Sequence, residues 1–290
     1  MKKVSSGYMY GLGSALVFSS VSILGKVIMT RGVDPGIVVF WQYLVVLIAL
    51  GTYFYLKKTP IGIKTPYTLL VGLFSIAANI SFYFAMDLAG AGLATLLLYS
   101  SSVFTALFFF LSGIRRIPPS GWLAIFLAMV GSALTLEIFA GFSIHPLGVF
   151  LGLFAGLAYC FYGVVLDLKL AKENFLMINF FIAFQGLIII SIFNFTRDIQ
   201  PWSILPQEIL ALLFLGLMAG ILPNYLSFSS IRLIGTEKTS VVMSMELPST
   251  VLLAFFLLNE KLNFIQALGI LLVLASVLLL RSQEEPAKES

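Results

Sequence analysis

Long apolar stretches follow one another along the whole chain, separated by short joints that carry charge, proline or glycine. Each stretch is close to the roughly 20 apolar residues that a helix needs to cross a bilayer. The pattern therefore predicts an all-α membrane protein with ten transmembrane helices. These helices are expected at residues 8–29, 37–56, 67–86, 93–112, 121–136, 147–166, 176–195, 209–231, 239–258 and 264–280.

The composition excludes an ordinary soluble domain. Hydrophobic residues make up 60% of the chain, charged residues only 10%, and the mean hydropathy is +1.04. A soluble protein of this size needs far more polar surface than these residues provide. Ten helices and their turns use nearly the whole sequence, so we expect no additional soluble domain.

The basic residues predict the orientation in the membrane. If the N-terminus is cytoplasmic, only Arg31, Arg197 and Lys261 lie outside, and Lys26 lies within the first helix. The positive-inside rule favours this arrangement, with both termini in the cytoplasm and the protein in the cell membrane. The thirteen basic residues placed inside are Lys2, Lys3, Lys57, Lys58, Lys64, Arg115, Arg116, Lys169, Lys172, Arg232, Lys238, Arg281 and Lys288.

Few residues in the chain are suited to hold a cofactor. There is one cysteine, Cys160, and one histidine, His145, which together cannot form an ordinary metal cage. No Walker element occurs, so we expect no ATP-driven step. The net charge of +4 follows from the predicted inside loops, and we expect no nucleic-acid partner. No cofactor is predicted.

The second half of the chain repeats the first weakly. A constant offset aligns residues 67–136 with residues 212–281 without a gap. Each half would hold five helices, an odd number, so the second copy would be inverted in the membrane relative to the first. Inverted repeats are typical of secondary transporters with a site near the midplane. We predict a first repeat at 1–140, a second at 141–283 and a cytoplasmic tail at 284–290. The aligned pairs are Asn79 with Asn224, Leu88 with Leu233, Gly90 with Gly235, Thr105 with Thr250, and Phe110 with Phe255.

Several segments resemble the drug/metabolite transporter superfamily, in its EamA-like branch. The joint 258–262, Leu-Asn-Glu-Lys-Leu, followed by Gln266 and Gly269, is similar to the Leu-Gly-Glu-Arg-Leu element of that family. Residues 244–248 resemble its Glu-Pro segment, and residues 99–104 resemble its Ser/Thr-x-Pro-Val-Phe segment. Lys26 lies where the family often has a lysine. The resemblance covers the full chain and implies the ten-helix, two-repeat fold.

The chain also departs from the family pattern. Ser102 replaces a usual proline, Arg115 replaces a frequent glutamate, and Asn259 replaces a glycine. Family members export or exchange amino acids, other metabolites, drugs or nucleotide-sugars. The resemblance therefore implies a small-molecule substrate without specifying it.

Polar side chains inside the apolar stretches are the main candidates for a substrate site, because such groups are costly in lipid and usually face a cavity. Glu246 is the outstanding one, two residues before Pro248, which should bend its helix. It is interpreted as a proton or cation site, or as a partner in an interhelical hydrogen bond. Asn79 and Asn224 occupy matching positions and would line a cavity or join helices.

Other residues are weaker candidates of the same kind. Lys26 is a second candidate for coupling, although its long side chain could instead extend to the membrane interface. Asp167 is expected to be solvated or to cap a helix, because it lies at a helix end. The weaker substrate-binding candidates are Trp41, Gln42, Tyr43, Tyr99, Ser100, Gln185 and Tyr225.

The leading functional prediction is a secondary transporter that exports small metabolites such as amino acids by alternating access. Proton coupling, antiport and facilitated diffusion all remain open. A facilitator or channel is the alternative, and an integral-membrane enzyme is disfavoured because His and Cys each occur once. The expected partners are the small-molecule substrate and the lipid bilayer, and the protein is expected to be a monomer or homodimer.

Overall fold

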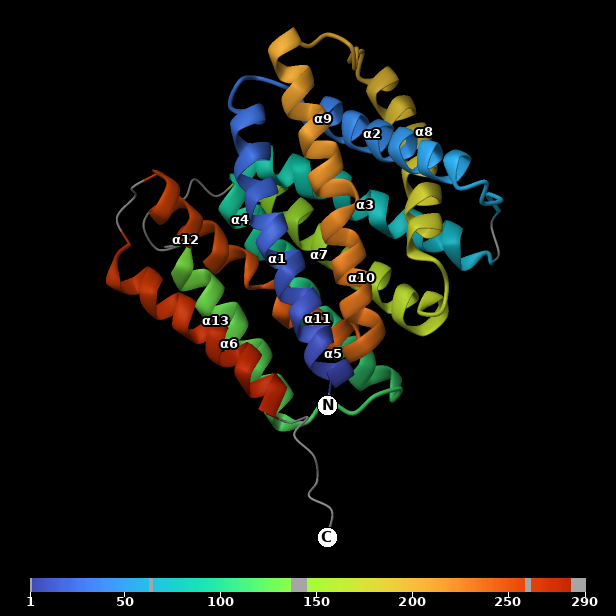
Figure 1. Ribbon diagram of the computed structural model, residues 1–290. Coiled ribbons are helices and arrows are strands. Elements are labelled where there is room, and N and C mark those ends of the chain that lie inside the picture. The colour runs from blue at the N-terminus through green and yellow to red at the C-terminus, as the bar shows by residue number, and fades with distance from the viewer. Residues whose placement is uncertain (1, 63–64, 137–144, 259–261, 283–290) are drawn as a thin grey trace.

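A computed structural model describes residues 2–62, 65–136, 145–258 and 262–282, and within these ranges the chain is helical with no strand (Figure 1). We refer to α1–α6 as the first half of the molecule and to α7–α13 as the second half. The helices of the first half are α1 (Lys2–Met29), α2 (Pro35–Leu56), α3 (Tyr67–Ala89), α4 (Ala91–Leu98), α5 (Ser100–Ser112) and α6 (Pro119–Thr135).

The second half repeats this order of long and short helices. A π-helical turn, η2, extends α7 by five residues. The elements are α7 (Pro146–Val165), η2 (Leu166–Leu170), α8 (Phe175–Thr196), α9 (Pro206–Gly220), α10 (Leu222–Ile234), α11 (Thr236–Met243), α12 (Glu246–Leu258) and α13 (Phe264–Ser282).

Among the described residues, eight stretches of helix are long and apolar enough to cross a membrane. The protein is therefore a multi-pass membrane protein. Of the other two predicted spans, one corresponds to the shorter apolar helix α6, and the other is divided between α11 and α12. The eight stretches are Val4–Met29, Pro35–Leu56, Tyr67–Ala89, Ala91–Ser112, Pro146–Leu170, Phe175–Thr196, Glu208–Ile234 and Phe264–Ser282.

Two glycines form matching corners in the two halves. Gly90 separates α3 from α4 with φ 84° and ψ 154°, and Gly235 separates α10 from α11 with φ 86° and ψ 161°. Residues with a side chain avoid this backbone region, so glycine is needed at both corners. The aligned glycines of the sequence thus adopt the same backbone conformation, and each redirects the chain into an eight-residue helix.

Three predicted spans are interrupted, each for a local reason. The fourth breaks at Tyr99, where the hydroxyls of Ser100 and Ser102 donate to Leu97 O and Tyr99 O at 2.6 and 2.8 Å. Such back-bonding by serine bends helices. The ninth breaks at residues 244–245, three to four residues before the bend expected at Pro248. Pro248 lacks an N–H, so it cannot continue the hydrogen-bond ladder back to residue 244.

The eighth predicted span breaks at Ile221, whose φ of −120° and ψ of −64° depart from helical values. Pro223 follows in the first turn of α10 and cannot donate to Ala219 O. The aligned position in the first half is Ala78, and α3 continues through it without interruption. The proline therefore makes the two halves differ here.

The two halves pack through each other's helices, as Figure 1 shows. α1 lies against α10, α3 lies against α7, and α2 contacts both α8 and α9. At one side α6 pairs with α13 at a close crossing, where a Cβ on Gly131 would lie 2.8 Å from Gly269 O. Only glycine permits this approach of the two backbones.

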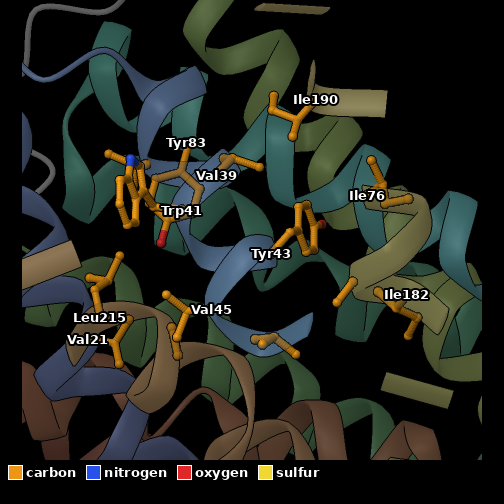
Figure 2. Packing of buried hydrophobic residues seen from close by; sticks show 14 of the residues in the cluster. Val21, Val39, Trp41, Tyr43, Val45, Ile76, Tyr83, Ile182, Ile190 and Leu215 are labelled. Carbon is orange, nitrogen blue, oxygen red and sulfur yellow. The ribbon is translucent and has the colours of Figure 1, made fainter. Parts of the chain in front are cut away.

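The largest buried cluster is built around α2. Figure 2 shows four α2 side chains lying between residues of α1, α3, α8 and α9. Because α2 is buried along most of its length, polar side chains on it are positioned by several neighbouring helices at once. The four α2 residues are Val39, Trp41, Tyr43 and Val45, and the labelled neighbours include Val21, Ile76, Ile182 and Leu215.

Candidate functional site

A central cavity lies between the two halves. It has a volume of about 130 Å³, counted as space open to the centres of water molecules. Residues of α1, α2, α3, α7, α8, α9, α10, α11 and α12 contribute to its lining, together with the break between α4 and α5. The cavity is thus formed by helices that are far apart in the sequence and that belong to both halves.

Glu246 is the one charged side chain among the described residues that line this cavity. It is 5% exposed and is the first residue of α12, where the positive end of a helix stabilises a carboxylate. The hydroxyl of Tyr99, at the break between α4 and α5, donates a short hydrogen bond to Glu246 Oε2. The two breaks at aligned positions therefore bring a carboxylate and a phenol together across the two halves.

Tyrosine is the most frequent residue type in the described lining. Tyr159 and Tyr162 of α7 stack with ring centroids 5.5 Å apart. Tyr99 contacts the Glu246 carboxylate, and Tyr83 and Tyr159 line the same cavity. The described lining thus combines the Glu246 carboxylate with several aromatic side chains.

The aligned asparagines both line the cavity but have different hydrogen-bond partners. Asn224 Nδ2 donates to Ala219 O at 3.1 Å and to Gly220 O at 3.2 Å, so it binds the carbonyls exposed by the helix break. Asn79 Nδ2 donates at 3.4 Å to Gln42 Oε1. The buried Asn79 Oδ1 has no hydrogen-bond partner among the described residues. Asn79 therefore presents an available acceptor, whereas the Asn224 amide is used by the backbone.

A cluster of charges joins the halves at the end of the molecule where α1 begins (Figure 1). Arg115 Nη1 and Nη2 contact the two Asp167 oxygens at 2.7 and 2.9 Å, and Nη1 contacts Glu237 Oε2 at 2.8 Å. The Arg115 guanidinium also lies 4.8 Å from the centroid of the Phe109 ring. Asp167, expected to be solvated or to cap a helix, is bound by Arg115 and accepts from the backbone N–H of Thr236, the first residue of α11.

Glu237 lies just ahead of the ninth predicted span, and its pKa reflects two opposing effects. Burial raises the pKa of the carboxyl above its ordinary value, and this effect exceeds the lowering caused by the positive charge of Arg115. The pKa of Arg115 is raised, because interactions with Asp167 and Glu237 outweigh the effect of burial on the guanidinium. Both carboxylates thus stabilise the charged form of Arg115. Burial, by contrast, destabilises the charged form of Glu237 more than Arg115 stabilises it.

A small second cavity, about 10 Å³ in volume, lies between the central cavity and this charge cluster. It shares Tyr159, Tyr162 and Met243 with the central cavity, and Thr236 connects it to Asp167. Its space is enough for roughly one water molecule. Hydroxyls are frequent in its lining, which includes Ser101, Thr105, Ser227, Thr239 and Ser240.

A second ion pair joins the halves at the opposite end of the molecule. Arg197, after α8, contacts both Asp34 oxygens at 3.1 and 3.2 Å. Asn194 Nδ2 donates to Gly36 O at 3.0 Å next to this pair. The central cavity therefore lies between two sets of charged contacts, each connecting the first half to the second.

The comparison with known sequences identifies the family. The sequence profile described as the EamA-like transporter family matches residues 5–137 and again residues 146–282. The chain belongs to the EamA-like transporter family. This membership agrees with the resemblance seen in the sequence, and it makes the protein a membrane transporter.

Two individual similarities accompany this EamA-like family match. An uncharacterized transporter of Archaeoglobus fulgidus is 25% identical over 266 residues, covering 88% of this chain and 90% of the relative. A crystal structure of another protein superposes with a TM-score of 0.80, covering 98% of this chain and 99% of the other, at 15% identity. The structural similarity supports the fold alone.

Six of the ten candidate binding residues line the central cavity of this transporter. Trp41 Nε1 instead donates to Pro201 O at 2.9 Å, Ser100 bonds Leu97 O, and Gln185 Nε2 donates to Phe181 O at 3.1 Å. Tyr225 is 46% exposed. The six at the cavity are Gln42, Tyr43, Asn79, Tyr99, Asn224 and Glu246. The side chain of the coupling candidate Lys26 lies outside the described part of the structure, as do residues 259–261 of the family-like joint.

The sequence analysis missed five polar residues at the cavity, one of which is Ser75. Asn179 is a polar residue within an apolar span and could have been singled out for that reason. Tyrosines are common near membrane interfaces, so nothing in the pattern distinguished Tyr83, Tyr159 and Tyr162 from interfacial residues. Their grouping around Glu246 depends on the packing of three separate helices.

Proposed function

We propose that the protein is a secondary carrier that exports a small amphipathic metabolite, such as an amino acid, across the cell membrane by alternating access. The observation that carries this proposal is the central cavity between two sets of charged contacts that link the halves. A carrier needs such a site, with a closure on each side that opens in turn.

The proposed architecture is ten transmembrane segments in two inverted repeats. Supporting it, α4 and α11 have identical bounds at an offset of 145 residues, and their preceding glycines share one conformation. The contacts between helices correspond as well. In this comparison α1 corresponds to α7, α2 to α8, and α3 to α9 and α10 together. The α1–α10 contact then corresponds to the α7–α3 contact, and the α2–α9 contact to the α8–α3 contact. The α6–α13 and α2–α8 contacts are converted into themselves, as a pseudo-twofold axis requires.

In one state of the proposed cycle, the Arg115 cluster is broken and the cavity opens toward the cytoplasm while the Asp34–Arg197 pair is formed. In the other state, the Arg115 cluster is formed, the Asp34–Arg197 pair is broken and the cavity opens to the outside. Both contacts join the first half to the second, so rocking the halves breaks one set at a time. The hydroxyl-lined second cavity would then widen into the cytoplasmic path. The positive-inside distribution supports cytoplasmic termini, and the direction of export rests on the resemblance to exporting family members.

Counterflow in proteoliposomes tests the carrier proposal. Vesicles containing the full-length protein are preloaded with an unlabelled compound from a panel of amino acids and amines, and the labelled compound is added outside in trace amount. A carrier transiently accumulates label against its gradient, because exchange is faster than net flux. Label that only equilibrates would indicate a channel, and no uptake of any panel compound would refute the transporter mechanism.

Cysteine accessibility tests the alternation. In a Cys160→Ala background, Ser101→Cys places a single thiol in the second cavity, where Ser101 is 1% exposed. Arg115→Ala should increase the rate at which a thiol reagent reaches this cysteine from the cytoplasmic side, and Asp34→Ala should decrease it. Equal labelling rates in the two variants would contradict alternating closure.

A further inference from the structure

The second cavity lies at a junction of the two halves. In its described lining, α5 of the first half contributes Ser101 and Thr105, and the other residues come from α7, α10 and α11 of the second half. Ser101 and Thr105 are four residues apart, so they lie on the same face of α5. The cavity volume of about 10 Å³ corresponds to about one water molecule. Whatever occupies this space therefore contacts both halves at once.

Ser101 brings an unpaired hydroxyl to this cavity. Its side chain is 1% exposed, and its Oγ has no hydrogen-bond partner among the described residues. The neighbouring hydroxyls of Ser100 and Ser102 differ, because they donate to the carbonyls of Leu97 and Tyr99. A buried hydroxyl without a partner destabilises the folded state. The position of Ser101 in the cavity lining therefore points to an occupant that can form a hydrogen bond with it.

Two hydroxyls of α11 in the same lining use their hydrogens elsewhere. Thr239 Oγ1 donates to Gly235 O at 2.8 Å. Ser240 Oγ donates to Glu237 O at 3.0 Å. Each hydroxyl has one hydrogen and two lone pairs, so these two can act only as acceptors toward the cavity. Ser101 still offers a donor, and the lining therefore suits a small molecule that both accepts and donates hydrogen bonds.

Water fits both the size of the cavity and its chemistry. A water molecule can accept from Ser101 and donate to the α11 hydroxyls, which agrees with the roughly two to four hydrogen bonds of buried water molecules. A monovalent cation of similar size has no hydrogen to donate. It would also exchange its hydration shell for neutral hydroxyls, because the described lining of this cavity includes no carboxylate. Water is therefore favoured over an ion.

We propose that the second cavity binds one water molecule, which links Ser101 of α5 to the hydroxyls of α11 and helps to keep the cytoplasmic side of the protein closed. The role in closure rests on the proposed carrier function, whereas the water site does not. Arg115 follows α5, and its partner Glu237 lies in α11. The water bridge and this ion pair thus join the same two regions, so they should break together when the central cavity opens to the cytoplasm.

The sign of a stability change tests for the water. Ser101→Ala should lower the Tm of the purified full-length protein by roughly 1–6 °C, because the bound water loses a partner. Ser132→Ala is the matched control: Ser132 Oγ is also buried without a partner among the described residues, but Ser132 lies outside the central and second cavities. The control should leave the Tm unchanged or raise it. The same result for Ser101→Ala would show a dry cavity and overturn the proposal.

Double-mutant cycles test the bridge. Ser101→Ala is combined with Thr239→Val and, separately, with Ser240→Ala. If one water binds both partners, the Tm change of at least one double variant should be smaller than the sum of the single changes by at least about 1 °C. Additive changes in both combinations would refute the bridge between α5 and α11.

A salt series separates water from a cation. Exchange of NaCl for KCl or choline chloride at equal ionic strength should leave the Tm of the wild-type protein unchanged, because water binding needs no particular ion. A Tm increase that is specific to Na⁺ or K⁺ and is lost in Ser101→Ala would assign the cavity to a cation and overturn the water site.

Thiol labelling tests the role in closure. Thr105→Cys in a Cys160→Ala background places a single thiol in the second cavity. Ser101→Ala should increase its labelling rate from the cytoplasmic side about two- to tenfold, because the closed state loses one hydrogen bond, and Ser132→Ala should not change it. An unchanged rate in Ser101→Ala would overturn the role in closure. Failure of counterflow in the same preparation would refute the carrier function, and the Tm changes would still decide the water site.

Discussion

Replacing either of the two aligned asparagines should have opposite consequences for stability and for binding. In Asn224→Ala, the carbonyl of Ala219 loses its donor at 3.1 Å, and Pro223 provides no N–H in exchange. Gly220 O keeps the Asn179 Nδ2 donor at 2.7 Å, so only one carbonyl becomes unsatisfied. An unsatisfied buried polar group costs about 1–3 kcal/mol, and hydrogen bonds between membrane helices average about 0.6 kcal/mol. We therefore expect a loss of about 1–2 kcal/mol.

Asn79→Ala removes a long hydrogen bond of 3.4 Å to Gln42 and an interaction with the Tyr43 hydroxyl, so the expected loss of stability is below about 0.5 kcal/mol. At roughly 2–4 °C per kcal/mol, Asn224→Ala should lower the Tm by roughly 2–8 °C and Asn79→Ala by less than about 2 °C. Asn79→Ala should nevertheless reduce substrate counterflow more than Asn224→Ala, because it removes from the cavity lining a buried acceptor that has no hydrogen-bond partner among the described residues.

Thermal unfolding of the purified variants at one scan rate, with counterflow in proteoliposomes measured alongside, checks both halves of this prediction. Asn224→Asp is a useful control, because it keeps the size of the side chain but has no donor, and it should be at least as destabilising as alanine. Equal Tm changes at the two positions, or a larger change for Asn79→Ala, would refute the assignment of the Asn224 amide to the helix break.

Three further predictions concern other parts of the molecule. Gly131→Leu should lower stability by about 1–3 kcal/mol or more in a denaturation assay, because its Cβ would lie 2.8 Å from Gly269 O; wild-type stability would refute the close crossing. Burial raises the pKa of Glu237 in the folded state above its ordinary value in the unfolded state. The contribution of Glu237 to stability is therefore present below the ordinary pKa and is lost as the pH rises through the raised pKa. Glu237→Gln should flatten that acidic part of the stability profile, and an unchanged profile would count against it. Reporter fusions after Ser282 and within residues 198–205 should report opposite sides of the membrane, and the same side would overturn the proposed topology.

The sequence by itself determined the class of the protein and much of its local geometry. Hydrophobic length is a sum over neighbouring residues, so the membrane-spanning helices can be predicted without knowing what packs against them. The aligned glycines Gly90 and Gly235 form their corners for an equally local reason, since only glycine readily occupies their backbone conformation. The family followed from short segments such as residues 244–248, whose serine and proline also interrupt the helix.

The tertiary structure decided which polar side chains meet. A helix that is apolar on all sides contains no signal for the direction in which a tyrosine or glutamine points, so Tyr83 and Tyr159 were missed while Trp41 and Gln185 were included. The contact of Arg115 with Asp167 joins residues 52 positions apart, and that of Asp34 with Arg197 joins residues 163 apart. Such contacts depend on how the two halves pack together, because each partner is contributed by a different half and local sequence does not specify which residue it will face.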